Sequence, residues 1–156
     1  MVYIKTVGKL VTGVLSLDEK LCKILSILKS YFSGGGLYDN NGSFKNGKWI
    51  ELSDSFYCYS QVTYQGEYKN CKKVGIWVIL GKIQGVNQEK GGGEYDDQLD
   101  CVNSLRNGLW IELSDEFDEL SQIIYKGEYK HGKKIGVWDE INFKKNEKCG
   151  QLNYEN

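Results

Sequence analysis

The stretch YKGEYKHGKKIGVW, residues 125–138, decides the fold. It joins a Gly-x-Tyr pair to a Gly-x-Trp pair through a short polar run, and each of the four tryptophans of the chain closes one copy of this phrase. The copies are Gly36-x-Tyr38 with Gly47-x-Trp49, Gly66-x-Tyr68 with Gly75-x-Trp77, Gly93-x-Tyr95 with Gly108-x-Trp110, and Gly127-x-Tyr129 with Gly136-x-Trp138. A repeat of this kind fixes the architecture before any single residue indicates a chemistry.

Each copy predicts a β-hairpin. Antiparallel pairing of its two halves places Gly66 opposite Trp77 and Tyr68 opposite Gly75, so that each ring covers the bare backbone across from it. The other three copies allow the same register. The pattern predicts strands near 36–44, 47–52, 61–68, 75–80, 93–96, 107–113, 122–129 and 136–142.

A longer period unites the hairpins in pairs. Residues 47–77 align without gaps on 108–138, and 19 of the 31 positions are identical. The repeating unit is therefore a double hairpin, and the array spans 34–142 with hairpins at about 36–52, 61–80, 93–113 and 122–142. Residues 143–156 are expected to be a tail or a truncated repeat, because Gly150 and Tyr154 resemble the start of a fifth unit.

Residues 1–33 precede the array. Gly13-x-Leu15 is typical of a degenerate half-repeat that lacks its tryptophan. An amphipathic helix is predicted from about 17 to 32, because Ser16 and Glu19 form a capping box and three glycines, 34–36, end the apolar periodicity. The predicted fold class is all-β: an elongated, single-layer antiparallel meander of hairpins with one N-terminal α-helix.

The phrase Y-x-G-x-Y-x-x-G-x-x-x-G-x-W, carried in full by residues 125–138, closely resembles the MORN repeat. Residues 64–77 differ from it mainly by Cys71 in place of glycine, and the openings at 34–39 and 91–96 resemble a divergent subtype. The resemblance covers 34–142. It implies a twisted single-layer sheet of hairpins, and it implies a scaffold for protein assembly, with lipid binding proposed for some members and an antitoxin role for a variant group.

Composition narrows the classes of function. The net charge of −1 argues against bulk attraction to nucleic acid, so no nucleic-acid partner is expected. The five cysteines contain no C-x-x-C pair, and a single histidine, His131, does not complete a zinc site. No metal or other cofactor is expected. An odd cysteine count without a signal peptide favours the cytoplasm, with association to cytoskeleton or membrane as a further expectation.

The sequence offers no set of catalytic residues, and no small-molecule substrate is expected. A nucleophile, a base and an orienting group must converge in an active site, whereas the one histidine falls in a predicted hairpin turn. The glycine triplets 34–36 and 91–93 open strands rather than helices, which argues against phosphate loops. The acidic connector 114–119 lacks the spacing and central glycine of an EF-hand.

The aromatic stripe is the candidate binding surface. Its rings are expected to knit neighbouring hairpins, and one face of a single-layer sheet has little other material to cover it. We expect a protein partner, bound as a peptide or helix on this face. The candidate residues are Tyr38, Trp49, Tyr64, Tyr68, Trp77, Tyr95, Trp110, Tyr125, Tyr129 and Trp138.

Basic turns support alternative functions. The hairpin turns of a meander share one edge, which would gather Lys72, Lys73, Lys133 and Lys134 there. Such lysines serve as solvated turns that protect a sheet edge, or they bind anionic phospholipid, gaining on the order of 1 kcal/mol each near a charged membrane. An antitoxin-like module and a piece of a duplicated array without an independent role are further alternatives.

Overall fold

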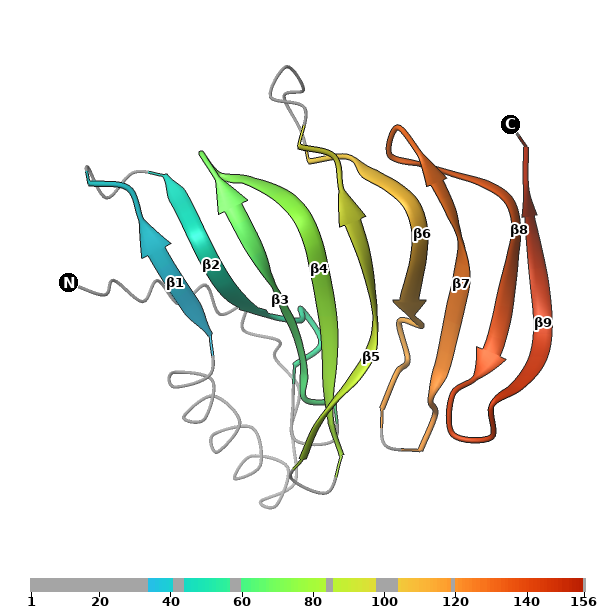
Figure 1. The fold of residues 1–156 in the computed structure, drawn as a ribbon. Coiled ribbons are helices and arrows are strands. Elements are labelled where there is room, and N and C mark those ends of the chain that lie inside the picture. Colours follow the sequence, from blue (N-terminus) through green and yellow to red (C-terminus); the bar gives the residue numbers. More distant parts are fainter. Residues whose placement is uncertain are drawn as a thin grey trace, which may run out of the picture.

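A single open sheet forms the described part of the protein. The computed structural model describes residues 34–40, 44–56, 60–83, 86–97, 104–118 and 120–155, and the predicted helix at 17–32 lies outside them. The strands are β1 (Gly35–Tyr38), β2 (Lys45–Leu52), β3 (Val62–Lys69), β4 (Lys72–Ile83), β5 (Val86–Tyr95), β6 (Arg106–Leu113), β7 (Ile123–Lys130), β8 (Lys133–Asn142) and β9 (Glu147–Tyr154). Every strand pairs antiparallel with the next, in sequence order (Figure 1). The predicted single-layer meander of hairpins is confirmed.

Strands β4, β5 and β9 extend beyond the pattern that the sequence predicts. Tyr95 and Glu94 pair with the start of β4, but β5 begins at Val86, in a polar run that pairs with Leu80–Ile83 through the backbone. Because these side chains are mostly polar, the start of β5 lacks the alternation of apolar and polar residues by which a strand is predicted from sequence. Residues 147–154 form β9 against β8, where Tyr154 lies opposite Gly136.

The predicted register is correct for the tryptophans and wrong for the tyrosines. Gly36 lies opposite Trp49 and Gly93 opposite Trp110, and a Cβ on Gly66 would come 2.3 Å from the Trp77 ring. Tyr68, however, lies opposite Lys73 instead of Gly75. The hairpins shift register next to the glycine–tryptophan pair, so that the second glycine falls in a bulge.

The bulge explains why glycine occupies the second position. Gly75 has φ +61°, a left-handed conformation in which a side chain would be strained. The tyrosine that lies opposite it comes from the next hairpin: Gly75 pairs with Tyr95. The three corresponding glycines share this conformation and the partner type, in the pairs Gly47 with Tyr68, Gly108 with Tyr129 and Gly136 with Tyr154. One glycine of each phrase makes room for a ring, and the other turns the backbone.

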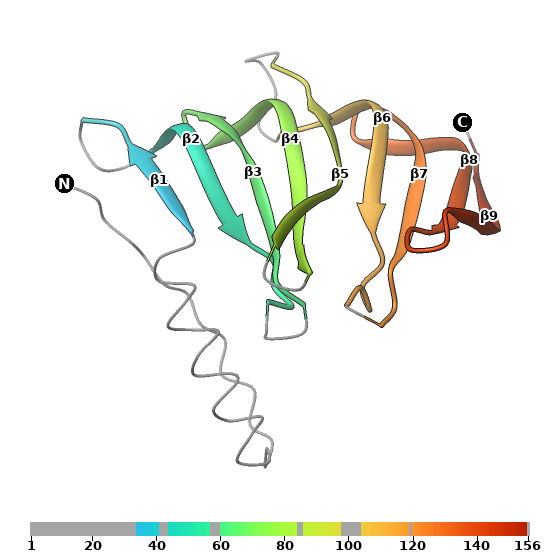
Figure 2. The ribbon, with the colours of Figure 1, turned by 60° about the horizontal axis from the view of Figure 1, so that its bottom comes forward.

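The sheet is strongly curved (Figure 2). The aromatic rings gather on one face, which we take as the concave face because Phe117 and Lys90 reach across the sheet on the same side. Contacts between segments that are not neighbours in the sheet accompany the curvature. The Ser60 hydroxyl donates to the carbonyl of Phe117 at 2.8 Å, and the Lys90 ammonium lies 4.0 Å from the centre of the Phe143 ring. Val62, Ile79, Phe117 and Ile124 form a second apolar cluster near this end of the strands.

Candidate functional site

A continuous ladder of nine aromatic rings crosses the concave face, one ring from each strand. Adjacent rings meet edge to face, with centroids 5.0–6.1 Å apart. Such pairs add about 0.5–1.5 kcal/mol each beyond the area that they bury. The ladder consists of Tyr38, Trp49, Tyr68, Trp77, Tyr95, Trp110, Tyr129, Trp138 and Tyr154.

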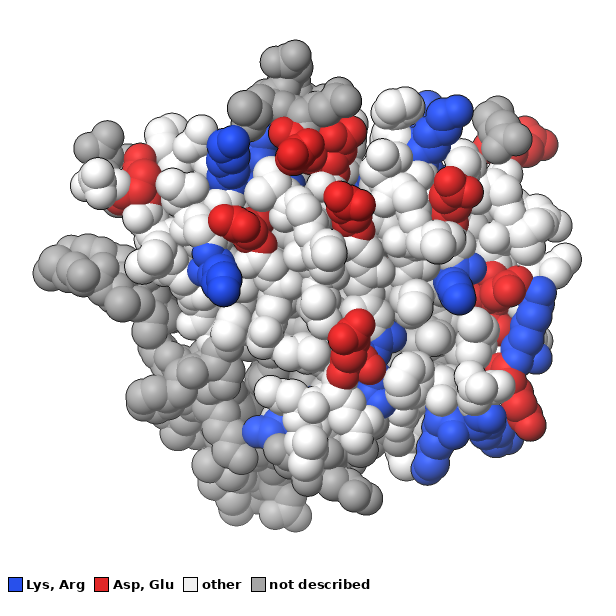
Figure 3. Space-filling view, in the orientation of Figure 1, with Lys and Arg blue, Asp and Glu red and all other residues white. Residues whose placement is uncertain are grey.

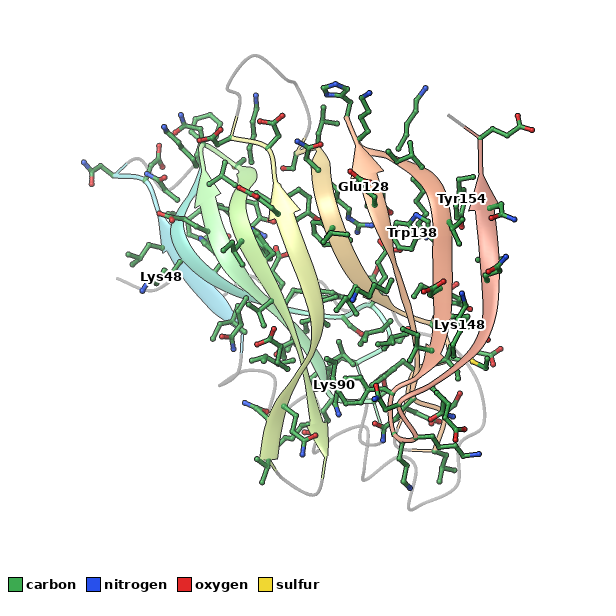
Figure 4. All side chains as sticks on the ribbon, turned by 45° about the vertical axis from the view of Figure 1, so that its right-hand side comes forward. Lys48, Lys90, Glu128, Trp138, Lys148 and Tyr154 are labelled. Atoms are coloured by element: carbon green, nitrogen blue, oxygen red, sulfur yellow. The ribbon has the colours of Figure 1, made fainter. Side chains whose placement is uncertain are left out.

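Although the sheet is a single layer, the tryptophans of the ladder are buried. Trp138 is 0% exposed, and Trp77 and Trp110 are 2% and 3% exposed. Trp138 lies flat against Gly127 and between Tyr129 and Tyr154, and the Lys134 ammonium lies 4.3 Å from its ring centre. Figure 4 shows Trp138 and Tyr154 side by side on β8 and β9. Glycine below, tyrosines beside and a cation above thus shield the ring from water.

Every tryptophan has such a cation four residues before it in the sequence. Lys45 lies 4.5 Å from the centre of the Trp49 ring, Lys73 4.1 Å from Trp77, and the Arg106 guanidinium 4.9 Å from Trp110. These distances are within the range of favourable cation–π contacts. Residues four apart on one strand share a face of the sheet, so the long side chain of each cation can reach the ring.

Two glutamates hold these cations in place. Glu51 accepts from Lys45 at 2.6 Å, from Lys73 at 2.7 Å and from the Tyr68 hydroxyl at 2.7 Å. In the second double hairpin, Glu112 pairs with Arg106 and with Lys134 at 2.8 Å, and it accepts from the Tyr129 hydroxyl at 2.9 Å. The 61-residue repeat of the sequence is therefore a repeat of an ion network.

Burial and hydrogen bonding oppose one another in setting the protonation of these networks. Burial would raise the pKa of Glu51, but the hydrogen bonds from Lys45, Lys73 and Tyr68 outweigh it and lower that pKa. Burial would lower the pKa of Lys134, and the bond to Glu112 raises it. Both shifts favour the charged forms of Glu51 and Lys134 near neutral pH.

A hollow of about 310 Å³ interrupts the covered face in the middle of the sheet. It lies over β3–β6, with Tyr95 as its lining residue from β5. The hollow is lined by Tyr64, Lys73, Trp77, Ile79, Tyr95, Arg106, Trp110, Glu112, Leu113 and Asp115. Burial raises the pKa of Tyr64, so its hydroxyl stays protonated as a hydrogen-bond donor.

Some of the candidate residues line this hollow, and the others lie elsewhere in the ladder, beside it or at the turns. The hollow brings together Tyr64, Trp77, Tyr95, Trp110 and Lys73 from the predicted sets. Trp49, Tyr68, Tyr129 and Trp138 are buried in the ladder, Tyr38 is its partly buried first ring, and Tyr125 is partly buried beside it. Lys134 caps Trp138, and Lys133 is exposed next to the turn between β7 and β8. Lys72 is partly buried at the start of β4.

Sequence reasoning missed the glutamates and part of the lining of the hollow. Glu51 and Glu112 organise the cations, and Ile79, Leu113 and Asp115 complete the walls. A signal for the first group was present: the spacing cation-x-Gly-x-Trp-x-Glu occurs at 45–51, at 106–112 and at 134–140.

No family model, curated protein or solved structure matches the chain. The family resemblance of the repeat phrase therefore supports proposals only.

The convex face has a different character. Glu67, Glu94 and Glu128 lie in the middle of the Gly-x-Tyr pairs, and the figure shows acidic groups over β3, β5 and β7 on a mostly uncharged surface (Figure 3). Ile76 and Leu109, from the Gly-x-Trp pairs, are 73% and 71% exposed. A wide, open depression of about 850 Å³ extends over β1–β5 and includes Lys48, Glu67 and Ile76 in its lining.

Across the described ranges, histidine, cysteine, aspartate and glutamate side chains do not gather in any group of three or more that could hold a metal ion. The same ranges contain no helix with the length and apolar character needed to cross a bilayer.

Proposed function

We propose that this protein is a non-catalytic, MORN-type adaptor that binds a protein segment on its concave aromatic face. The observation that carries the proposal is the hollow over β3–β6, which Trp77, Tyr95 and Trp110 line together with the charged groups of Lys73, Arg106 and Glu112. Aromatic residues combined with a few charged groups are typical of the centres of protein interfaces. The resemblance to scaffold repeats supports the same class of function.

The size and rigidity of the hollow favour a side chain of a protein segment as its occupant. About 310 Å³ accommodates one or two side chains, and the walls come from four adjacent strands whose positions are fixed by the ladder. A preformed pocket on a rigid sheet loses little conformational entropy on binding. A segment lying along the concave face would therefore be anchored at this point.

Binding of anionic phospholipid through the lysine turns is less well supported. Of the four lysines considered for it, Lys73 and Lys134 are paired with Glu51 and Glu112 and cover tryptophan rings. A membrane would have to displace these contacts in order to use them. Liposome co-sedimentation at low salt separates the two functions, since the adaptor proposal expects no binding that depends on Lys72, Lys73, Lys133 and Lys134 together.

Selection of a random peptide library on the immobilised protein tests the proposal. Ile79 lines the hollow and Ile76, on the same strand, is exposed on the opposite face, so that they form a matched pair. We expect the selected peptides to lose binding to Ile79→Phe, which fills the hollow, and to keep it with Ile76→Phe. Circular dichroism checks that both variants fold. Peptides that bind Ile79→Phe as well as wild type, or that depend on Ile76, would contradict the proposal.

A further inference from the structure

One strand of the sheet breaks the pattern that surrounds the glutamates. The sequence cation-x-Gly-x-Trp-x-Glu places Glu51 after Trp49, Glu112 after Trp110 and Glu140 after Trp138. On β4 the same spacing runs from Lys73 through Trp77 and ends at Ile79. The strand that lines the hollow is therefore the strand on which the repeated carboxylate is missing.

The groups that would hold a carboxylate at this position are nevertheless present. Glu51 is bound by the cation six residues before it, by the tyrosine opposite Gly47, and by the cation opposite that tyrosine, namely Lys45, Tyr68 and Lys73. Glu112 is bound in the same way by Arg106, Tyr129 and Lys134.

For position 79, the same relations identify three other residues. Lys73 stands six residues before Ile79, Tyr95 lies opposite Gly75, and Arg106 lies opposite Tyr95. All three line the hollow, together with Ile79 itself. Arg106 donates to the Tyr95 hydroxyl at 3.4 Å, and the Lys73 ammonium lies 5.8 Å from the Tyr95 ring centre. The two cations thus flank Tyr95, as Lys45 and Lys73 flank Tyr68.

The charges of the network are unbalanced at this point. Four cations, Lys45, Lys73, Arg106 and Lys134, share two carboxylates, Glu51 and Glu112. A glutamate at position 79 would bring the ratio from four against two to four against three. Among the described residues, the Tyr95 hydroxyl meets no carboxylate, whereas Tyr68 and Tyr129 each donate to one. Asp115 also lines the hollow, but it belongs to the connector that follows β6 and is not the strand position at which the pattern places a carboxylate.

We propose that the Lys73–Tyr95–Arg106 group is an unfilled carboxylate socket, which takes the side-chain carboxylate of a glutamate or aspartate from an acidic protein segment. The proposal rests on the adaptor function and names the chemistry of its partner. The carboxylate would receive hydrogen bonds from the Lys73 ammonium, the Tyr95 hydroxyl and the Arg106 guanidinium, as Glu51 and Glu112 do in their own networks. Charge-assisted bonds of this kind are stronger than bonds between neutral groups.

The first test needs no partner. Ile79→Glu supplies the missing carboxylate from the protein itself, and Ile79→Gln has the same shape without the charge. We expect Ile79→Glu to unfold at a higher urea concentration than Ile79→Gln at pH 7, and the difference to disappear when the carboxylate is protonated in acid. Equal midpoints at pH 7 would overturn the socket, whatever the adaptor function proves to be. Ile76→Glu and Ile76→Gln, on the exposed face, form the control pair and should differ little.

The second test uses two fluorescent peptides, Gly-Leu-Glu-Leu-Gly and Gly-Leu-Gln-Leu-Gly, acetylated and amidated at their ends. We expect wild type to bind the glutamate peptide about tenfold or more tightly than its glutamine twin, and Ile79→Glu to lose that preference because its own carboxylate fills the socket. Ile76→Glu should keep it.

Equal binding of both peptides to wild type overturns the choice of an acidic segment and leaves the adaptor function standing. Library peptides that bind only outside the hollow overturn the adaptor function, while the urea comparison still decides the socket. Displacement of the glutamate peptide by anionic vesicles would overturn the choice of a protein as the source of the anion.

Discussion

Replacing Gly127 by alanine tests the packing on which the fold depends. A Cβ at this position would lie 2.3 Å from the Trp138 ring, although carbon atoms pack at about 3.5–4.0 Å. Trp138 is fully buried, so its ring has no space into which it could retreat without disturbing Tyr129 and Tyr154. Gly127→Ala should therefore displace the ring and open the ladder at this strand.

The expected loss of stability follows from two contributions. Overpacking a filled site costs about 1–3 kcal/mol, and displacing Trp138 weakens its edge contacts with Tyr129 and Tyr154, each worth about 0.5–1.5 kcal/mol. Together they predict a decrease of about 3 kcal/mol in the free energy of unfolding. Urea unfolding followed by tryptophan fluorescence and circular dichroism measures this decrease.

Gly150→Ala is the matched control for this measurement. Gly150 lies in β9, and the nearest atom to an added Cβ there is a carboxylate oxygen of Glu140 at 3.1 Å, at the end of a side chain that can move aside. In the background of Trp138→Leu, Gly127→Ala should cost much less than in wild type, because the flat ring is gone. If Gly127→Ala unfolds within about 0.5 kcal/mol of Gly150→Ala, the contact between ring and glycine does not hold the sheet together.

Further predictions concern the charged groups and the convex face. Glu51→Gln should lower the free energy of unfolding by about 2 kcal/mol at pH 7. Because the folded pKa of Glu51 lies below its ordinary value of 4.5, its contribution to stability is present above pH 4.5 and is lost as the pH falls below it. Urea titrations of wild type and variant should therefore converge in acid, and a difference that persists at low pH would contradict the ion network. Lys90 is buried beside Phe143, donates a hydrogen bond to Gln88, and has a pKa that burial lowers. Lys90→Met should therefore raise the free energy of unfolding by about 1 kcal/mol at neutral pH, and this gain should shrink as the pH approaches 10.5. A loss of stability would show that the ammonium is needed for packing. Ile76→Ser and Leu109→Ser should each change the thermal unfolding free energy by about 0.5 kcal/mol or less, because both side chains are exposed, and a larger loss would place the convex face inside an interface or core.

The sequence is sufficient to predict the hairpins, because glycine and large rings alternate at fixed spacing. The hairpin pattern predicts that the Trp77 ring packs against Gly66, and the two residues are in contact. It is not sufficient to separate the two uses of glycine. Gly66 makes room for a ring and Gly75 adopts a left-handed conformation, and both appear in the sequence as glycine two positions before an aromatic residue. The tyrosine register was wrong for this reason.

The candidate surface was predictable in its residues and not in its accessibility. A stripe of tyrosine and tryptophan on one face suggests an open aromatic surface, but whether the rings are open depends on side chains that reach across strands. Lys73 and Lys134 belong by sequence to lysine-rich turns, and in space they cover Trp77 and Trp138. The curvature of the sheet, which forms the hollow around Ile79, depends on contacts between distant strands that local spacing does not encode.

Nuclear magnetic resonance of the wild-type protein titrated with the glutamate peptide tests the binding account most directly. The account predicts that the Arg106 side-chain N–H signal and the backbone signals of Ile79 and Tyr95 shift with the peptide, and that signals of Ile76 and Leu109 on the opposite face do not. Shifts concentrated at Ile76 and Leu109, with the Arg106 signal unchanged, would contradict it.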